Sequence, residues 1–117
     1  MSVRRIVCDF HAADPGASRE FYVEVLGLEV AMDHGWIVTF AAPGRPATQI
    51  SVMRQDAGAA VQPDASIEVD DVDAVHAEAR RLGYEILHPL TDEPWGVRRF
   101  FVRDPTGKVI NVLSHPR

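Results

Sequence analysis

The sequence predicts an α+β fold in which two βαβββ repeats form a curved mixed sheet, with helices on its outer face and a cleft on its inner face. Three observations support this prediction. The expected elements follow the order strand, helix, three strands, linker, strand, helix, three strands. Short sequence segments recur at nearly constant offsets. The chain has 117 residues, the length of a single domain with one substantial core.

The first repeat is expected over about residues 3–54. Asp14-Pro15-Gly16 marks a helix start, because Asp can cap free backbone amides and Pro suits the first helical position. Apolar residues then recur at helical spacing, and Gly27 ends the helix. The apolar residues in question are Phe21, Val25 and Leu28. The strands expected in this repeat cover residues 5–10, 29–32, 36–41 and 48–54.

The second repeat is expected over about residues 64–115, after a linker at Gln55–Pro63 that is rich in Ala, Gly and Pro. Its helix begins near Asp70-Asp71, has Arg80-Arg81 in its last turn and stops at Gly83. The apolar positions of this helix are Val72, Val75, Ala79 and Leu82. The expected strands cover residues 65–69, 85–88, 97–103 and 109–114. Together the two repeats predict one domain over residues 1–117.

Direct sequence similarity supports the repeat. The segment Leu26-Gly27-Leu28-Glu29-Val30 matches Leu82-Gly83-Tyr84-Glu85-Ile86 at an offset of 56 residues. Ile50-Ser51-Val52-Met53 matches Ile110-Asn111-Val112-Leu113 at an offset of 60 residues. A single βαβββ unit cannot cover both faces of its sheet, so two units are expected to curve around a shared cleft.

Side chains alternate between the two faces of a strand, which predicts which residues face the cleft. The apolar sets are expected to pack under the helices, with Cys8 as a buried hydrophobic side chain. These sets are Ile6, Cys8 and Phe10; Ile50 and Val52; Ile67 and Val69; and Ile110 and Val112. The opposite face carries Asp9, His11, Gln49, Ser51, Ser66, Glu68 and Asn111, with Val7, Met53 and Leu113. This mixed face is either the solvated side of an open sheet or a ligand cleft.

Composition narrows the range of partners. The chain has twelve Lys and Arg and seventeen Asp and Glu. The resulting net charge of −5 argues against nucleic-acid binding. The cluster of Arg98, Arg99 and Arg103 is more typical of a solvated or anion-pairing face. No apolar run approaches the ~20 residues of a membrane span, and no apolar signal core follows the first residues. The single Cys8 cannot form an internal disulfide, so we expect a cytoplasmic protein.

Three segments resemble the vicinal oxygen chelate superfamily, which includes glyoxalase I, extradiol dioxygenases and bleomycin-resistance proteins. The segment from Ala17 to Leu28 is similar to the family's S-x-x-F-Y-x-x-x-L-G helix. Asp104-Pro105-Thr106-Gly107-Lys108 is similar to its D-P-x-G turn before the last strand. Glu93 to Phe100 resembles the P-W-G-x-R segment of the bleomycin-resistance-like branch. The resemblance covers nearly the whole chain and implies the fold predicted above.

The resemblance also implies one divalent metal, held by His, Glu or Gln on the first, fourth, fifth and last strands. Counting from the matched motifs, these points fall on Val7, Ser51, Asp64 and Asn111. Of these side chains, only that of Asp64 is a good ligand, whereas a transition-metal site needs about three strong ligands. We therefore expect no metal and no other cofactor. A displaced metal site that uses Asp9, His11 and Glu68 remains an alternative.

Two functions follow as hypotheses. The first is a homodimer that binds a small molecule in its cleft, with Trp36 and Trp95 as stacking surfaces and acidic groups for a cationic ligand. The second is a metal-dependent lyase, isomerase or dioxygenase of the same fold acting on a small oxygenated metabolite. A structural or regulatory dimer with a vestigial cleft is a third class. No catalytic residue is assigned, and the candidate ligand-binding residues are Asp9, His11, Trp36, Gln49, Ser51, Glu68, Trp95, Arg99 and Asn111.

Overall fold

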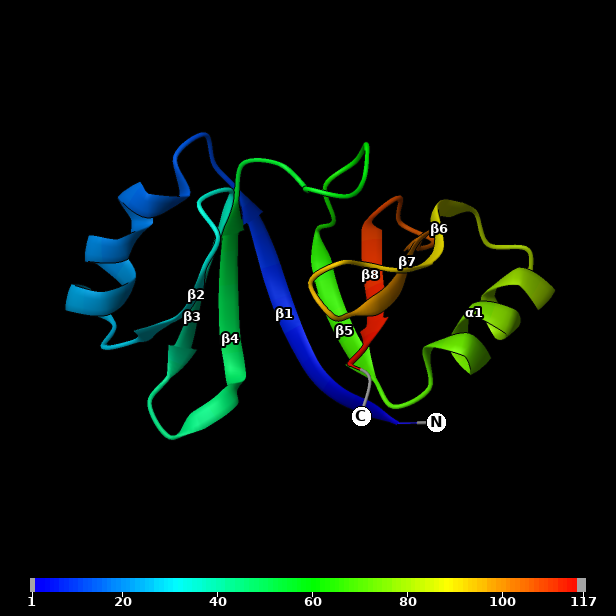
Figure 1. The fold of residues 1–117 in the computed structure, drawn as a ribbon, viewed down its shortest axis with the longest axis horizontal. Coiled ribbons are helices and arrows are strands. Elements are labelled where there is room, and N and C mark those ends of the chain that lie inside the picture. Colours follow the sequence, from blue (N-terminus) through cyan, green and yellow to red (C-terminus); the bar gives the residue numbers. More distant parts are fainter. Residues whose placement is uncertain (1, 116–117) are drawn as a thin grey trace.

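The computed structural model describes residues 2–115, so Met1, Pro116 and Arg117 of the predicted domain lie outside the described residues (Figure 1). The strands are β1 (Val3–His11), β2 (Glu29–Asp33), β3 (Ile37–Ala42), β4 (Arg45–Met53), β5 (Ala65–Val69), β6 (Ile86–Asp92), β7 (Arg98–Arg103) and β8 (Val109–Ser114). The helical segments are η1 (Pro15–Ser18), η2 (Glu20–Val25) and α1 (Val72–Arg81). None of the helices in the described range is long and apolar enough to cross a membrane.

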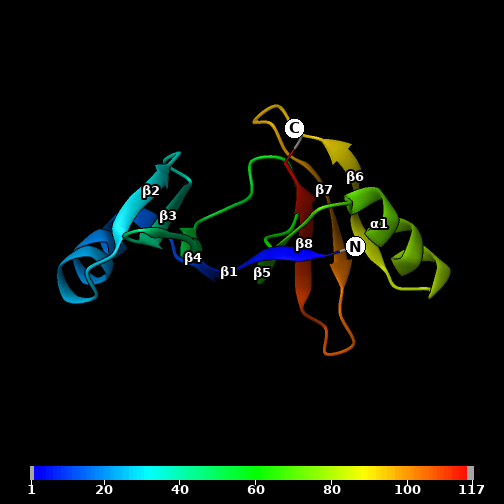
Figure 2. The ribbon, with the colours of Figure 1, turned by 90° about the horizontal axis from the view of Figure 1, so that it is seen from below.

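The strands form one open eight-stranded mixed sheet in the order β2-β3-β4-β1-β5-β8-β7-β6. β1 pairs in parallel with β4, β5 pairs in parallel with β8, and the two halves of the sheet join through the antiparallel β1–β5 pair. Seen from below, the halves rise on either side of a floor formed by β1 and β5, with the helices on the outer flanks (Figure 2). The predicted α+β fold class is confirmed.

Each half has its own hydrophobic core beneath its helix. In the second half, α1 covers Val69, Phe100 and Val112, with Ile67 and Ile110 packed against them. In the first half, Val38, Phe40 and Val52 form the core, and Tyr22, Val23, Leu28 and Ile50 pack against it. The apolar strand sets predicted on β4, β5 and β8 therefore do lie under the helices.

The prediction for the apolar set of β1 is wrong. Ile6 is 60% exposed, Phe10 is 48% exposed, and Cys8 is also exposed rather than buried. β1 lies at the centre of the sheet, whereas the two helices cover only its outer parts (Figure 1). The convex face of β1 is therefore left uncovered, and its buried side chains, Val7 and Asp9, point into the concave side.

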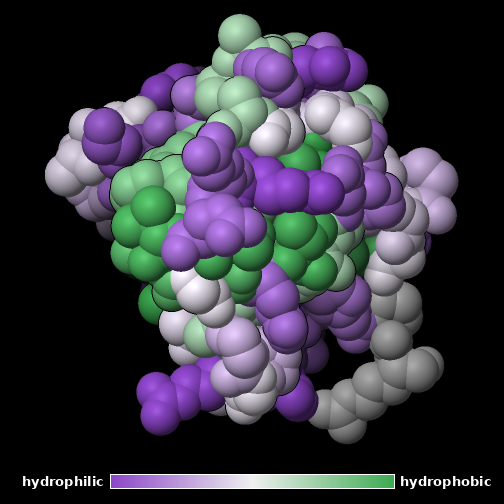
Figure 3. All heavy atoms as spheres, turned by 90° about the vertical axis from the view of Figure 1, so that its left-hand side faces the viewer, coloured by the Kyte–Doolittle hydropathy of each residue, from purple (hydrophilic) through white to green (hydrophobic). Residues whose placement is uncertain are grey.

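The first helical segment also differs from the regular helix expected. A short 3₁₀ turn is followed by a wide π-type turn, in which the Leu26 amide donates to the Phe21 carbonyl at 3.3 Å. The Asp14 side chain makes no cap hydrogen bond. The wider turn rotates the helix surface, so Phe21 and Val25 are exposed although their spacing predicted a buried face. Figure 3 views this flank and shows hydrophobic surface on both sides of a hydrophilic band.

The second helix matches its prediction closely. The Asp71 carboxylate accepts a hydrogen bond from the Ala74 amide at 3.1 Å, as an N-cap residue should. Arg80 and Arg81 occupy the last turn. Gly83 then adopts a φ of 82°, a left-handed conformation that a helix C-terminus commonly requires.

Candidate functional site

A cavity of about 380 Å³ opens on the concave side of the sheet. Both halves of the chain line it, because its floor is formed by the central strands and its mouth by loops from each side. The residues that line it include Val7, Asp9, Trp36, Thr39, Ser51, Asp56, Ser66, Trp95, Arg99 and Asn111.

The floor carries a row of polar side chains that crosses five neighbouring strands, here called the polar row. Its members are Thr39 on β3, Ser51 on β4, Asp9 on β1, Ser66 on β5 and Asn111 on β8. Strand register aligns Thr39 with Ser51, Ser51 with Asp9, and Ser66 with Asn111. The alignment places short polar groups side by side on the floor of the cavity.

Hydrogen bonds connect most of the polar row. The hydroxyls of Thr39 and Ser51 lie 2.7 Å apart. The Asn111 amide donates to the Ser66 hydroxyl at 3.1 Å, and that hydroxyl donates to Oδ2 of Asp9 at 2.6 Å. Ser66 thus fixes one carboxylate oxygen of Asp9. The hydrogen bonds among residues 2–115 include none to its other oxygen, Oδ1.

Asp9 is only 5% exposed, and this burial is the main reason that its pKa rises to about 6. The hydrogen bond from Ser66 and the nearby His11 oppose the rise, whereas Asp56 and Asp64 add to it. A carboxyl group with this pKa exchanges a proton near neutral pH, which an ordinary surface aspartate does not.

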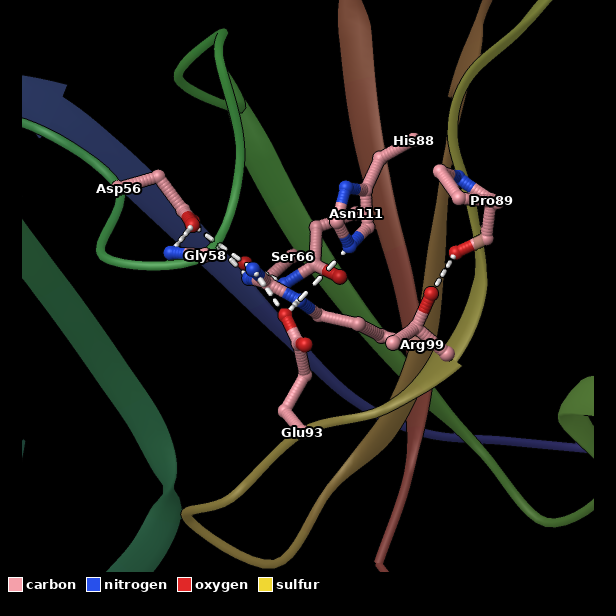
Figure 4. A network of polar contacts seen from close by, with 9 residues as sticks. Asp56, Gly58, Ser66, His88, Pro89, Glu93, Arg99 and Asn111 are labelled. Carbon is pink, nitrogen blue, oxygen red and sulfur yellow. Dashed lines mark hydrogen bonds and ion pairs between the residues drawn. The ribbon is translucent and has the colours of Figure 1, made fainter.

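One wall of the cavity is built around a buried arginine. The Arg99 guanidinium donates two hydrogen bonds to Asp56, at 2.9 and 2.7 Å, and its Nε donates to Glu93 at 2.7 Å (Figure 4). Exposed fractions of these three side chains are 4%, 2% and 6%. Trp95 and Phe101 stack on the same guanidinium, with ring centres 4.9 and 4.8 Å from its carbon. Arg99 therefore ties the linker after β4 to the loop after β6.

The cluster of Arg99, Asp56 and Glu93 is not balanced in charge, because two carboxylates face one cation. His88 lies beside it, with its Nε2 3.4 Å from a Glu93 oxygen, and this nitrogen is buried without a hydrogen-bond partner among the described residues. Gly58 also packs tightly on this cluster, since a Cβ there would lie 2.6 Å from a Glu93 oxygen.

Two tryptophans meet at the mouth of the cavity. Trp36 comes from the first half and Trp95 from the second, and their ring centres lie 6.2 Å apart at an angle of 62°. His34 stacks on Trp36 with a centre distance of 6.4 Å. The entrance therefore presents aromatic faces from both halves of the chain.

The structure brings most of the predicted ligand-binding residues together. Asp9, Trp36, Gln49, Ser51, Trp95, Arg99 and Asn111 all line the cavity. His11 and Glu68 do not. The His11 ring lies 2.9 Å from the Pro63 carbonyl, and Glu68 pairs with Arg5 at 3.1 Å and His115 at 2.8 Å. Their strand parity was the reason for including them, but both side chains are taken up by neighbours at the ends of their strands.

Sequence reasoning missed several members of this site. Thr39 joins the polar row only through strand register, which one sequence does not reveal; Ser66 was predicted on the cleft face by alternation, but its hydrogen bond to Asp9 was not. Asp56 lies in a linker that carries no pattern pointing to a buried ion pair. Glu93 directly precedes Pro94-Trp95-Gly96, the segment that resembles the family motif. Of the missed residues, it is therefore the one that the sequence indicated most clearly as a neighbour of the site.

The donors present do not fit the metal that the resemblance implied. Val7 has no donor atom, the Ser51 hydroxyl pairs with Thr39, and the Asn111 amide donates to Ser66. The Asp64 carboxylate accepts a hydrogen bond from the Val109 amide at 2.8 Å and is not among the lining residues. Across residues 2–115, His, Cys, Asp and Glu side chains form no group of three or more that could hold a metal ion. The alternative trio of Asp9, His11 and Glu68 is likewise not assembled.

Comparison with known proteins places the chain in a family. The Glyoxalase/Bleomycin resistance protein/Dioxygenase superfamily profile matches residues 7–112. No curated protein sequence matches significantly. A superfamily member from Vibrio splendidus 12B01 has a similar structure, with a TM-score of 0.67, 16% identity and coverage of 98% of this chain and 100% of that chain.

Two further solved structures share the fold. Methylmalonyl-CoA epimerase from Streptomyces coelicolor is 19% identical, with a TM-score of 0.67 and coverage of 98% and 97% of the two chains. Homoprotocatechuate 2,3-dioxygenase from B. fuscum is 20% identical, with a TM-score of 0.72 over 99% of this chain but 33% of that one. At these identities the likeness concerns the fold alone, whereas the profile match spans most of the sequence. The chain therefore belongs to the Glyoxalase/Bleomycin resistance protein/Dioxygenase superfamily.

Proposed function

We propose that this protein binds a small molecule in the cavity between its two halves, in the manner of the bleomycin-resistance-like branch and without a divalent metal. The observation that carries the proposal is the cavity itself. It has a volume of about 380 Å³, a polar row on its floor and two tryptophans at its mouth. Concave sites that combine apolar and aromatic side chains with placed polar groups are typical of small-molecule sites.

The charges around the cavity favour a cationic or hydrogen-donating aromatic ligand. Arg99 is already paired with two carboxylates, so it has little capacity to attract an anion. Asp9 lines the cavity, and among the described residues its Oδ1 accepts no hydrogen bond. Trp36 and Trp95 offer ring faces on which a planar or cationic group can stack. The P-W-G-x-R segment supports the assignment to this branch, because it supplies Trp95.

We also propose that the protein is a cytoplasmic homodimer. Ile6 and Phe10 leave apolar surface on the convex face of β1, and the exposed Cys8 lies between them. A second copy that covers this strip would bury apolar area that otherwise faces water. A free, accessible thiol is compatible with a reducing compartment.

A binding screen tests the proposed function. Metal-stripped protein is titrated with planar aromatic amines and with neutral and anionic analogues of the same size, and Tm and tryptophan fluorescence are recorded. We expect the amines to raise Tm and change the fluorescence, and Trp95→Ala to weaken both effects. Tyr84→Ala, on the exposed α1 flank, is the matched control. A flat response across all three ligand classes would contradict the proposal.

Calorimetry tests the expected independence from metal. The stripped protein is titrated with Mn(II), Fe(II), Ni(II) and Zn(II). We expect no stoichiometric binding, because the donors at the family positions are unsuitable. Binding tighter than about 1 μM, or roughly −8 kcal/mol, would instead favour the metal-dependent enzyme.

A further inference from the structure

We propose that a second small-molecule site lies in a groove between α1 and the end of β7, and that it takes a neutral compound with a single aromatic ring. This outer groove has a volume of about 460 Å³. α1 stands on the outer flank of the second half, away from the concave side of the sheet (Figure 1). Among the described residues, the outer groove and the concave cavity share no lining residue. The outer groove is therefore a different site from the one proposed above.

The exposed surface that lines the outer groove is almost wholly apolar. α1 contributes Val75, Ala79 and Leu82, and Val102 and Pro105 lie opposite them. Val75, Ala79 and Val102 also pack against the hydrophobic core of the second half, so the base of the groove is the edge of that core. Leu82, at one side, is 56% exposed. A concave apolar surface of this kind gains free energy when an apolar molecule displaces water from it.

The first half of the chain carries a larger strand residue at the position that corresponds to Val102. Phe40 pairs with Ile50 on the neighbouring strand, whereas Val102 pairs with Ile110. Ile50 and Ile110 are matching positions in the two sequence repeats. Val102 therefore stands in the second half where Phe40 stands in the first, and Phe40 is fully buried.

The helix residues differ in the same direction. The offset of 56 residues between the two helical segments aligns Val23 with Ala79 and Tyr22 with Glu78. In the first half the Tyr22 ring lies 5.1 Å from the Phe40 ring, centre to centre, and Val23 packs against the same core. The second half has a smaller apolar side chain in place of Val23 and no aromatic ring in place of Tyr22. A ring with one small polar substituent, like the side chain of Tyr22, matches what the second half lacks.

The charges at the rim of the outer groove favour a neutral ligand. Glu78 accepts a hydrogen bond from Arg81 at 3.0 Å, and Arg103 pairs with Glu85 at 3.1 Å. The Asp104 carboxylate accepts three hydrogen bonds within its own turn. Each of these charged groups already has a partner, so an ionic group on the ligand would gain little and would lose hydration.

p-Cresol tests the inference, because it has the structure of a tyrosine side chain and is uncharged at pH 7. Methyl NMR spectra of the protein are recorded as p-cresol is added. We expect saturable ring-current shifts at the methyl groups of Val75, Ala79 and Val102, with a dissociation constant on the order of 1 mM for so small a ligand. Tyramine and 4-hydroxyphenylacetate carry the same ring with a charge, and they should shift these methyl groups less at equal concentration.

Two variants change the outer groove in different ways. Val102→Phe introduces the residue of the first half and should weaken p-cresol binding by ~10-fold or more, because the added ring fills the space. Leu82→Ser removes apolar surface at the side of the groove and should weaken binding several-fold. Leu26→Ser is the matched control and should bind like the wild type, since Leu26 is the repeat equivalent of Leu82, is 55% exposed and does not line the groove. Both leucines are more than half exposed, so both serine variants should fold.

Several results would overturn the inference. Saturable shifts confined to methyl groups of the concave cavity, such as those of Val7 and Leu113, would show that the ring binds there instead. Equal weakening by Leu82→Ser and Leu26→Ser, or unchanged binding by a folded Val102→Phe, would show that the outer groove is not the site. If the groove methyl groups shift with protein concentration in the absence of p-cresol, the occupant is a second copy of the chain. An absence of any saturable shift would also refute the site and would leave the proposed binding in the concave cavity unaffected.

Discussion

Replacing Arg99 with methionine would leave two buried carboxylates, Asp56 and Glu93, facing each other without their cation. Three charge-assisted hydrogen bonds of 2.7–2.9 Å would be lost, and the exposed fractions of the two carboxylate side chains are only 2% and 6%. Removing one partner of a buried ion pair costs about 3–5 kcal/mol, mostly because the remaining charge is stranded. We therefore expect Arg99→Met to lower the free energy of unfolding by ~4 kcal/mol at pH 7.

Urea unfolding measures this loss, and Arg98 provides the matched control. Arg98 is adjacent in sequence, but its side chain is 35% exposed and pairs with the exposed carboxylates of Asp73 and Asp92. Arg98→Met should change the midpoint little, because surface ion pairs contribute little to stability. The slope of the urea dependence should stay constant if both variants unfold in two states.

The same cluster allows a stricter test. If stranded charge is the cause, replacing Asp56, Glu93 and Arg99 together with apolar residues should recover most of the stability that Arg99→Met loses. A loss for Arg99→Met of less than ~1 kcal/mol would refute the reasoning, since it would show that the carboxylates are readily hydrated or protonated. A triple variant no more stable than Arg99→Met would refute it independently.

Three other predictions follow from buried or uncovered groups. The pKa of Asp9 is raised from 3.8 to about 6, so the stability that this group contributes is present below pH 4 and is lost as pH rises through 6. The difference in the free energy of unfolding between the wild type and Asp9→Asn should therefore shift by roughly 2–3 kcal/mol between pH 4 and pH 7. A difference that stays constant with pH in urea unfolding would contradict this. Gly58→Ala should destabilise the protein by ~1–3 kcal/mol in thermal unfolding, because the added Cβ would clash with the ion cluster. Gly16→Ala is the control and should not destabilise it, since the atom nearest to the added Cβ lies 3.5 Å away. Equal effects of the two substitutions would argue against close packing at Gly58. Ile6→Asp combined with Phe10→Asp should convert the proposed dimer into a monomer in light scattering, and an unchanged mass would place any dimer contact elsewhere.

The fold was predictable because its signals are local and occur twice. Asp71 and Gly83 bound a helix wherever it packs, and matching segments indicate two copies of one unit. The apolar face of β1 could not be predicted in the same way. Alternation correctly separated Ile6 and Phe10 from Val7 and Asp9, but which face is covered depends on where the helices lie relative to the central strand.

The site was predictable where strand parity alone decided the outcome. Asp9, Ser51 and Asn111 face the cavity as their parity required. The partners of these residues depend on register between strands that are far apart in sequence, so the links through Thr39 and Ser66 were not accessible. The π-type turn near Phe21 likewise follows from packing rather than from local spacing, which predicted a regular helix.

The two hydrophobic clusters share no residue, so each half of the chain has its own core and no single core joins them. The halves are joined by the backbone ladder between β1 and β5 and by the ties that Arg99 makes to the linker. A ligand that contacts both walls of the cavity would then restrict the motion of one half of the sheet relative to the other. Amide exchange along β1 and β5 should slow on binding even though no ligand atom contacts those amides. Either wall can also diverge in sequence without disturbing the core that supports the other.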